Sequence, residues 1–268
     1  MRRQKDDKLN RLQQLPEGQV VTTRSLAAAG YSRQLLAKYV GGGWLEKVGH
    51  GVFRRPGPPL KWQHVVYSLQ AQGLSLHPGG ETSLALLGRA HQLPLSGQMT
   101  VHLYGSAKLP SWTARAVPGV RFRHHAGALF EEHGKPRPKD VATGTALGLQ
   151  SHIWGPWDWS LRISSLERAW LELLQGVPKE LGFDEVDELA TGLQSLRPKA
   201  MDALLGRCKS FKVRRLAVWL AERHQHAWLS KINLKAVDLG RGKRALAPGG
   251  RLIKRYGITV PKHLADGV

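Results

Sequence analysis

Residues 20–55, VVTTRSLAAAGYSRQLLAKYVGGGWLEKVGHGVFRR, constrain the fold more than any other part of the chain. Two short segments with helical patterns flank Gly30, and the triplet Gly41–Gly43 separates the second from two strand-like segments. Glycine ends helices readily because it adopts left-handed backbone angles at little cost. Two helices, a break and a hairpin in this order are typical of a winged helix-turn-helix. A small helical subdomain with a packed hairpin is the alternative.

The first helix of this pair is predicted at Arg24–Ala29. Either Thr22 or Thr23 can cap it, because a threonine hydroxyl accepts a hydrogen bond from the free amides at a helix start. Gly30 ends it. A preceding helix is expected within Lys5–Leu15, where leucines recur at helical spacing. Three helices and a hairpin complete the predicted unit.

The second helix, at Arg33–Val40, carries the side chains best suited to DNA. Ser32 precedes it and offers a capping hydroxyl. Two leucines and a tyrosine form one apolar stripe, which leaves Arg33, Gln34 and Lys38 on the other side. Their donors match the acceptors of base edges and phosphates. We expect this segment to be the recognition helix.

The hairpin is predicted at Trp44–Val48 and Val52–Arg55, joined by the turn Gly-His-Gly. Its basic end is expected near the sugar-phosphate backbone of DNA. The predicted DNA-binding residues are therefore Thr22, Thr23, Arg24, Ser32, Arg33, Gln34, Lys38, His50, Arg54 and Arg55.

The charge balance favours a polyanionic partner. The chain has 40 Lys and Arg against 20 Asp and Glu, a net charge of +20, which exceeds what solubility requires. No segment approaches the roughly 20 apolar residues of a spanning helix, and the N-terminus lacks the apolar core of a signal peptide. The single cysteine, Cys208, allows no internal disulfide. We expect a cytoplasmic protein without membrane contact, and double-stranded DNA as its first partner.

A second basic surface is expected near the C-terminus. The segment Gly206–Lys262 holds 15 basic residues against only two acidic ones. A solvated face without a partner is the alternative, since charge runs are usually solvated. The candidate residues for this second functional surface, with nucleic acid as one partner, are Lys209, Lys212, Arg214, Arg215, Arg241, Lys243 and Arg244.

The rest of the chain predicts a mixed domain followed by a helical one. After the linker Arg55–Lys61, helices are expected at Trp62–Gln72 and Glu81–Gly88, and alternating residues predict strands at Met99–Tyr104 and Val120–His124. The basic run at 135–139, KPRPK, is read as a loop, and its neighbourhood through residue 156 as irregular.

A helical part is predicted from Ile163 onward. Ser164 and Glu167 match a capping box, and further helices are expected from Asp184, over Ala200–Cys208 and over Val213–His224, before closing hairpins within residues 237–260. The fold class is thus α+β, with a winged helix-turn-helix, a mixed α/β domain and a helical C-terminal region with short closing strands. The predicted domains are residues 1–57 and 58–268, the latter mixed over about 62–160 and mainly helical over about 161–268.

The chain shows little sign of catalysis. No Glu-x-Lys sequence of the kind common in metal-dependent nucleases occurs. The pairs His124–His125 and His224–His226 lack a companion ligand at metal-binding spacing, and the glycine-rich segment Gly79–Gly88 lacks the Lys-Ser/Thr of a phosphate-binding loop. We expect no catalytic residues, no metal and no cofactor.

The chain resembles the AbiEi antitoxins of bacterial type IV toxin–antitoxin systems over nearly its whole length. The resemblance rests on the order of SRQLLAKYVGGGWLEKVGHGVFRRPG, HPGGETSLALLGRAHQLP, VHLYG, LPSW, ISSLERAWLELL, DEVDELATGLQSLRPK, KVRRLAVWLAERHQHAW, DLGRGKR and YGITVPK. It implies a winged helix that binds inverted repeats in the promoter of its own operon and represses it. It also implies a C-terminal part that counters a nucleotidyltransferase toxin, with no need for direct contact.

Two other hypotheses stay open from the residues alone. One is a ligand-responsive winged-helix transcription factor unrelated to a toxin, and the other is a nucleic-acid-processing enzyme. A toxin gene of nucleotidyltransferase type directly downstream would favour the antitoxin over the first. Metal-dependent cleavage of DNA by the purified protein would favour the second.

Overall fold

The structure is a computed structural model that describes residues 2–89, 97–131, 148–155 and 159–265. The chain forms two compact units, each made of separate segments. The first unit comprises Met1–His77, Pro94–Ala126 and Ser151–Leu161, and the second comprises Pro78–Leu93, Gly127–Gln150 and Arg162–Val268. The domain boundaries predicted from the sequence remain predictions.

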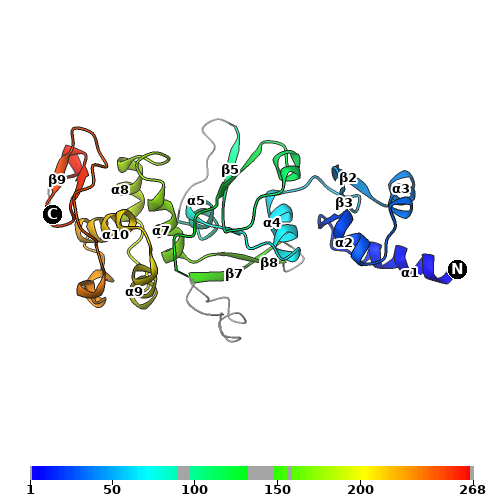
Figure 1. The fold of residues 1–268 in the computed structure, drawn as a ribbon, viewed down its shortest axis with the longest axis horizontal. Helices are drawn as coiled ribbons and strands as arrows, with labels where there is room; N and C mark the ends of the chain where they lie inside the picture. Colours follow the sequence, from blue (N-terminus) through cyan, green and yellow to red (C-terminus); the bar gives the residue numbers. More distant parts are fainter. Residues whose placement is uncertain (1, 90–96, 132–147, 156–158, 266–268) are drawn as a thin grey trace. The chain divides into compact units, whose positions relative to one another are not determined.

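The N-terminal part of the first unit has the winged helix-turn-helix topology (Figure 1). A three-stranded antiparallel sheet of order β1-β3-β2 accompanies three helices. The predicted elements are confirmed to within about two residues at most ends, the usual uncertainty of helix and strand termini. The elements are α1 (Arg2–Gln13), β1 (Val20–Thr22), α2 (Thr23–Ala28), α3 (Arg33–Gly41), β2 (Glu46–Gly49) and β3 (Val52–Arg54).

One apolar cluster holds these elements together. Every helix and strand of the winged helix except β2 contributes at least one buried side chain to it. Tyr31, in the turn between α2 and α3, is buried and donates from its hydroxyl to the carbonyl of Lys8 at 2.8 Å. The cluster fixes the angle of α3 against α1 and α2. Its members are Leu12, Val21, Leu26, Tyr31, Leu36, Tyr39, Leu45 and Phe53.

The first unit continues with α4 (Trp62–Ala71), β5 (Met99–Tyr104), η1 (Ser111–Arg115) and β6 (Val120–His125). The two predicted strands are confirmed. They pair in parallel, from Met99 opposite Val120 to Tyr104 opposite His125, and η1 lies in the crossover that parallel pairing requires. The two-residue strand β4 (His77–Pro78) completes this sheet in the order β4-β5-β6.

Helix α4 is hydrogen-bonded to the outer edge of β1. The hydroxyl of Ser68 accepts from the amide of Val20 at 2.8 Å, and the side-chain amide of Gln72 donates to the carbonyl of Val20 at 3.3 Å. These bonds and the buried apolar face of α4 connect the winged helix to the rest of the first unit.

The expectation of irregular structure through residue 156 was wrong for residues 149–154. They form β7 (Leu149–Trp154), which pairs with β8 (Trp159–Ser164). In β8 the side chains of Trp159, Leu161 and Ile163 are buried, whereas those of Ser160 and Arg162 are exposed. This alternation is the two-residue period of a half-buried strand. The predicted loop at 135–139 lies outside the described residues.

The second unit is built on helices, as predicted. Helix α7 packs against α5, α9 and α10 (Figure 1). Trp170 and Trp219 are fully buried in the shared core. The predicted closing hairpin is also confirmed as an antiparallel pair. The elements are α5 (Gly80–Leu86), α7 (Leu166–Gln175), α8 (Phe183–Thr191), α9 (Pro198–Arg207), α10 (Phe211–Arg223), η3 (Leu229–Lys231), η4 (Leu234–Ala236), β9 (Arg251–Ile253), β10 (Ile258–Val260) and η5 (Lys262–Leu264).

The capping box predicted at Ser164 and Glu167 was wrong by one residue. Ser165 caps α7, because its hydroxyl accepts from the amide of the third helical residue at 3.4 Å. The Ser164 hydroxyl instead donates to the carboxylate of Glu172 at 2.7 Å. Glu167 is buried and accepts from the backbone amide of Arg197 at 3.0 Å and from its guanidinium at 2.8 Å. A buried carboxylate needs such charged donors, and these lie thirty residues away in the sequence.

Candidate nucleic-acid interface

Helix α3 presents a continuous polar face. Ser32 caps the helix by accepting from the amide of Leu35 at 3.2 Å, as predicted. Leu36 and Tyr39 point into the core, so the helical period turns the opposite side outward. The exposed side chains on and beside this helix are those of Ser32, Arg33, Gln34, Ala37 and Lys38.

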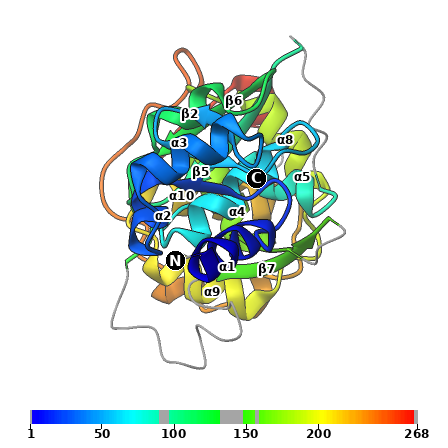
Figure 2. The ribbon, with the colours of Figure 1, turned by 90° about the vertical axis from the view of Figure 1, so that its right-hand side faces the viewer.

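The cations of α3 are available for an outside partner. Within the described part of the chain, neither Arg33 nor Lys38 uses its side chain in a hydrogen bond or ion pair, and both are exposed. Their N–H groups therefore point to solvent, where acceptors on DNA would replace water. In Figure 2, α3 lies beside β2, the outer strand of the wing.

Helix α2 is positioned by its two threonines. Thr22 caps it: the Thr22 hydroxyl accepts from the Ser25 amide at 3.2 Å while the Thr22 amide donates to the Ser25 hydroxyl at 3.0 Å. Thr23 fastens the turn of the wing, since its hydroxyl and amide both donate to the carbonyl of Gly51, at 3.1 and 2.7 Å. Arg24 is exposed at the helix start. The two threonines thus fix the wing relative to α2.

The wing exposes Lys47 and His50. Lys47 was missed by the sequence interpretation, although its place on a short strand, between the half-buried Glu46 and Val48, signals an outward side chain. Arg54 differs from the expectation: its side chain is only 14% exposed and binds the Glu46 carboxylate at 2.7 Å and two backbone carbonyls after β3. Arg54 therefore braces the wing through contacts within the protein.

Arg55 is also drawn toward the protein. One guanidinium nitrogen, Nη1, donates to the carbonyl of Leu15 at 2.7 Å, and the side chain is half-buried. This contact ties the end of the wing to the end of α1. Lys47 and His50 are the outward-facing groups of the wing, and the expected contact of Arg54 and Arg55 with the sugar-phosphate backbone stays a prediction.

The charge of this region is almost entirely positive. Between residues 20 and 55 the one acidic residue is Glu46, and Arg54 neutralises it. Arg24, Arg33 and Lys38 remain as exposed cations on the two helices of the motif. Their field attracts a polyanion and weakens as salt rises.

The second predicted basic surface is smaller than expected. Arg215 is buried, at 2% exposure, and its guanidinium donates to the carbonyls of Leu239, Gly242 and Gly257 at 2.6, 2.7 and 3.1 Å. Desolvation lowers its pKa, as does the charge of Arg244. The expectation that Arg215 belongs to an exposed basic surface was wrong, because the carbonyls of three residues between 239 and 257 draw the cation inward.

Lys212 and Arg214 are likewise committed to the fold. The Lys212 ammonium donates to the carbonyls of Gln175 and Val177, at 2.6 and 2.7 Å, where α7 ends and leaves carbonyls without helical partners. The Arg214 side chain is 12% exposed and donates to the Asp238 carbonyl at 2.7 Å. The candidates that stay exposed are Lys209, Arg241, Lys243 and Arg244.

The histidines singled out in the sequence serve structural bonds. His124 contacts the carbonyl of Gly105 at 2.9 Å, His224 the carboxylate of Asp187 at 2.7 Å, and His226 the carbonyl of Ala190 at 2.9 Å.

A further imidazole pair was not predicted. His102 Nδ1 and His125 Nε2 face each other at 3.0 Å on adjacent strands. Burial lowers the pKa of His102 to about 4, and the neighbouring cationic groups add to this. These two nitrogens are of the type that ligates transition metals, and the parallel register of β5 and β6 is what brings them together.

Comparison with known proteins identifies the family. The family description "Transcriptional regulator, AbiEi antitoxin, Type IV TA system" matches residues 98–261, and "Transcriptional regulator, AbiEi antitoxin N-terminal domain" matches residues 5–95. The chain belongs to the AbiEi family. The resemblance stated from the sequence is thereby confirmed, and the family is one of transcriptional regulators and antitoxins, which is not an enzyme class.

A comparison with curated proteins finds no match. Among solved structures, three chains match. One is the crystal structure of the RV2827C protein from Mycobacterium tuberculosis, with 16% identity, a TM-score of 0.51, and coverage of 92% of this chain and 87% of that chain. At this identity the likeness shows a shared fold alone. Across the described residues of this AbiEi-family chain, no helix has the length and apolar character needed to cross a membrane.

Proposed function

We propose that this AbiEi-family protein binds operator DNA through α3 and thereby represses its own operon. The observation that carries the proposal is the exposed face of α3, where Arg33 and Lys38 engage no described protein group. A capped helix that offers several free donors on one side is suited to the major groove. An operator with inverted repeats would then be bound by two copies.

The side chains suggest separate roles. Arg33 suits bidentate bonds to guanine, and Gln34 suits bidentate bonds to adenine. Lys38, Lys47 and Arg24 suit phosphates, which set position and supply salt-dependent affinity. Ser32 and His50, at the start of α3 and the tip of the wing, are proposed to contact the backbone of DNA.

The test is operator binding by the double variant Arg33→Ala/Lys38→Ala, measured by fluorescence anisotropy at several salt concentrations. Loss of the base contact costs roughly 1–3 kcal/mol, or about 5- to 150-fold in affinity, and loss of the phosphate contact lowers the salt slope by about one. Lys199→Ala/Arg207→Ala is the matched control, since it removes the same two charges from exposed positions of α9. Equal affinity for wild type and the α3 variant would disprove the recognition helix.

We further propose that residues 58–268 counter a nucleotidyltransferase toxin encoded alongside, without a requirement for direct contact. The exposed cations Lys209, Arg241, Lys243 and Arg244 are the proposed surface, for an antitoxin role or a second nucleic-acid contact. Arg214 and Arg244 both place their guanidinium groups near the ring of Phe211, at 5.5 and 6.0 Å from its centroid, so part of this surface is held in place by cation–π contacts.

Co-expression with the adjacent toxin gene tests this role. Arg241→Ala/Lys243→Ala/Arg244→Ala should reduce rescue from toxicity while leaving operator affinity within about threefold of wild type. The α3 variant Arg33→Ala/Lys38→Ala should show the reverse pattern. Full rescue by the triple variant at equal expression would contradict the proposed surface.

A further inference from the structure

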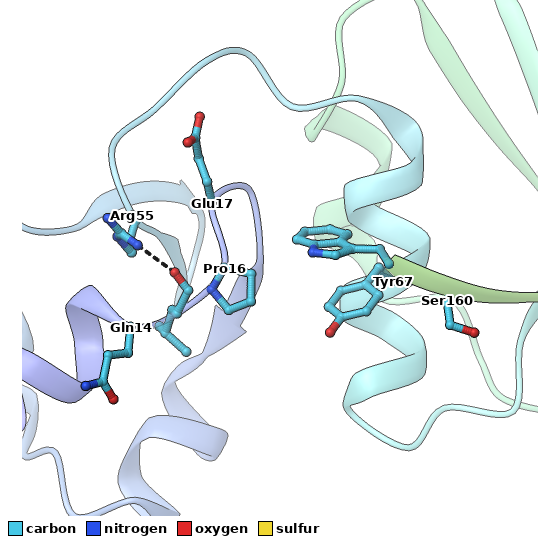
Figure 3. A pocket seen from close by; sticks show the side chains of 8 residues that line it. Gln14, Pro16, Glu17, Arg55, Tyr67 and Ser160 are labelled. Carbon is cyan, nitrogen blue, oxygen red and sulfur yellow. Dashed lines mark hydrogen bonds between the residues drawn. The ribbon is translucent and has the colours of Figure 1, made fainter. Parts of the chain in front are cut away.

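The first unit contains a pocket with a cavity volume of about 610 Å³, within the range of small-molecule sites. Its walls come from the segment between α1 and β1, from the residue that follows β3, and from α4 and β8. Figure 3 shows Gln14, Pro16, Glu17 and Arg55 on one side, with Tyr67 and Ser160 on the other.

The two sides of the pocket are joined by contacts. The bonds of Ser68 and Gln72 to Val20 attach α4 to β1, directly after the segment that carries Glu17. Gly18 lies with positive φ against the imidazole of His64, so close that a Cβ at this position would collide with the ring. The pocket is therefore a built feature of the first unit.

One wall offers an aromatic surface. The ring of Tyr67 stacks on that of Trp159, with centroids 4.0 Å apart and planes 23° from parallel. Trp159 is 3% exposed, and the edge of its ring also meets His64 at 5.3 Å between centroids. Tyr67 is thus fixed from behind while remaining half-exposed in the pocket. Such a ring is suited to stacking with a planar ligand.

The opposite wall carries two charges that do not neutralise each other. Arg55 uses Nη1 for the carbonyl of Leu15, and within the described residues its other guanidinium N–H groups have no partner. The Glu17 carboxylate forms neither a hydrogen bond nor an ion pair with any described residue. The guanidinium can only donate and the carboxylate can only accept. A complementary ligand therefore has a planar ring, an anionic group and N–H donors.

We propose that this pocket binds a guanine mononucleotide. The base stacks on Tyr67, its N1–H and N2–H groups donate to Glu17, and the phosphate accepts from Arg55. Guanine is favoured over adenine because it presents two adjacent donors to one carboxylate, whereas adenine presents one exocyclic amine beside an acceptor. The inference goes beyond operator binding and does not depend on it.

The test is calorimetric titration of the full-length protein with GMP, AMP, guanosine and inorganic phosphate. The affinity for GMP should exceed that for AMP by at least about tenfold, as expected for one additional charge-assisted hydrogen bond. Arg55→Gln should weaken GMP about tenfold and leave guanosine unchanged. Glu17→Gln should weaken both about tenfold and remove the preference over AMP. Tyr67→Leu should weaken GMP and guanosine alike.

Matched variants separate binding from folding. Arg121→Gln removes a cation from an exposed site on β6 of the same unit and should bind GMP as wild type does. Because Arg55 also holds the Leu15 carbonyl, Arg55→Lys keeps a donor there and should weaken GMP less than Arg55→Gln does. Thermal unfolding checks that each variant is folded.

The proposal would be overturned by no saturable binding of GMP, by equal binding of GMP and AMP, or by equal GMP affinity in wild type and all three pocket variants. Phosphate that binds as tightly as GMP would remove the role of the base and overturn it as well. The α3 variant Arg33→Ala/Lys38→Ala should bind GMP normally. Failure of operator binding and failure of nucleotide binding are thus observed separately.

Discussion

Replacing Arg215 by methionine should destabilise the second unit without touching an exposed surface. The guanidinium donates to three carbonyls, and the Gly257 carbonyl also accepts from the Arg244 amide at 2.8 Å. Gly242 is exposed, so water can replace its lost bond. The variant loses the charged hydrogen bonds and leaves the carbonyl of the half-buried Leu239 without its donor. Together these losses should lower the free energy of unfolding by about 2–4 kcal/mol.

This loss corresponds to a fall in melting temperature of roughly 5–15 °C for a chain of this size. Differential scanning calorimetry measures it directly. Lys243→Met is the matched control, because it removes one positive charge from an exposed side chain without a described partner, and it should change stability by less than about 0.5 kcal/mol. An Arg215→Met protein that melts with wild-type stability but loses toxin rescue would refute the assignment of Arg215 to the core.

Three further predictions concern local structure. Ser32→Ala should lower the free energy of unfolding by about 1 kcal/mol, because the α3 cap is lost, whereas Ser32→Gly should lower it by only about a few tenths of a kcal/mol. Equal losses for the two variants in urea titrations would argue against capping. Gly18→Ala should destabilise more than Gly73→Ala, since both have positive φ but only Gly18 has a neighbouring ring in the way of a Cβ; equal melting temperatures would count against this contact. Burial raises the pKa of Glu167, but the donors of Arg197 outweigh this and lower it to about 2. Stability should therefore be full above pH 4.5 and fall between pH 4.5 and 2, by at most about 3 kcal/mol, since Arg197 is partly exposed. In a plot of the urea midpoint against pH, Glu167→Gln should remove most of the fall between pH 4.5 and 2. An unchanged plot would contradict the pairing of Glu167 with Arg197.

The recognition helix could be predicted because its determinants are local. The cap at Ser32, the apolar spacing of Leu36 and Tyr39 and the outward side chains Arg33 and Lys38 all lie within eight residues. A helical period decides burial when neighbouring side chains share one face. The same holds for the helices of the second unit, most of whose bounds were close to those expected.

The fate of individual cations could not be predicted in this way. Arg54, Arg55 and Arg215 all bind carbonyls, and those of Arg55 and Arg215 lie 24 to 42 residues distant. Periodicity places a long basic side chain on a face, but it does not show whether a buried carbonyl lies within its reach. The cap of α7 was misplaced for a related reason, since the sequence does not show that Glu167 meets Arg197.

The bonds between α4 and β1 protect an edge of the wing sheet. β1 is an outer strand, and the amide and carbonyl of Val20 would otherwise stand open as a template for another strand. Ser68 in α4 and Gln72 at its C-cap occupy both groups, so strand addition at this edge is opposed. A DNA-binding fragment that stops at residue 57 uncovers the edge and should tend to aggregate, whereas one that extends through Gln72 keeps both groups of Val20 covered. The length of α4, more than that of the wing, therefore sets the shortest useful fragment for studies of operator binding.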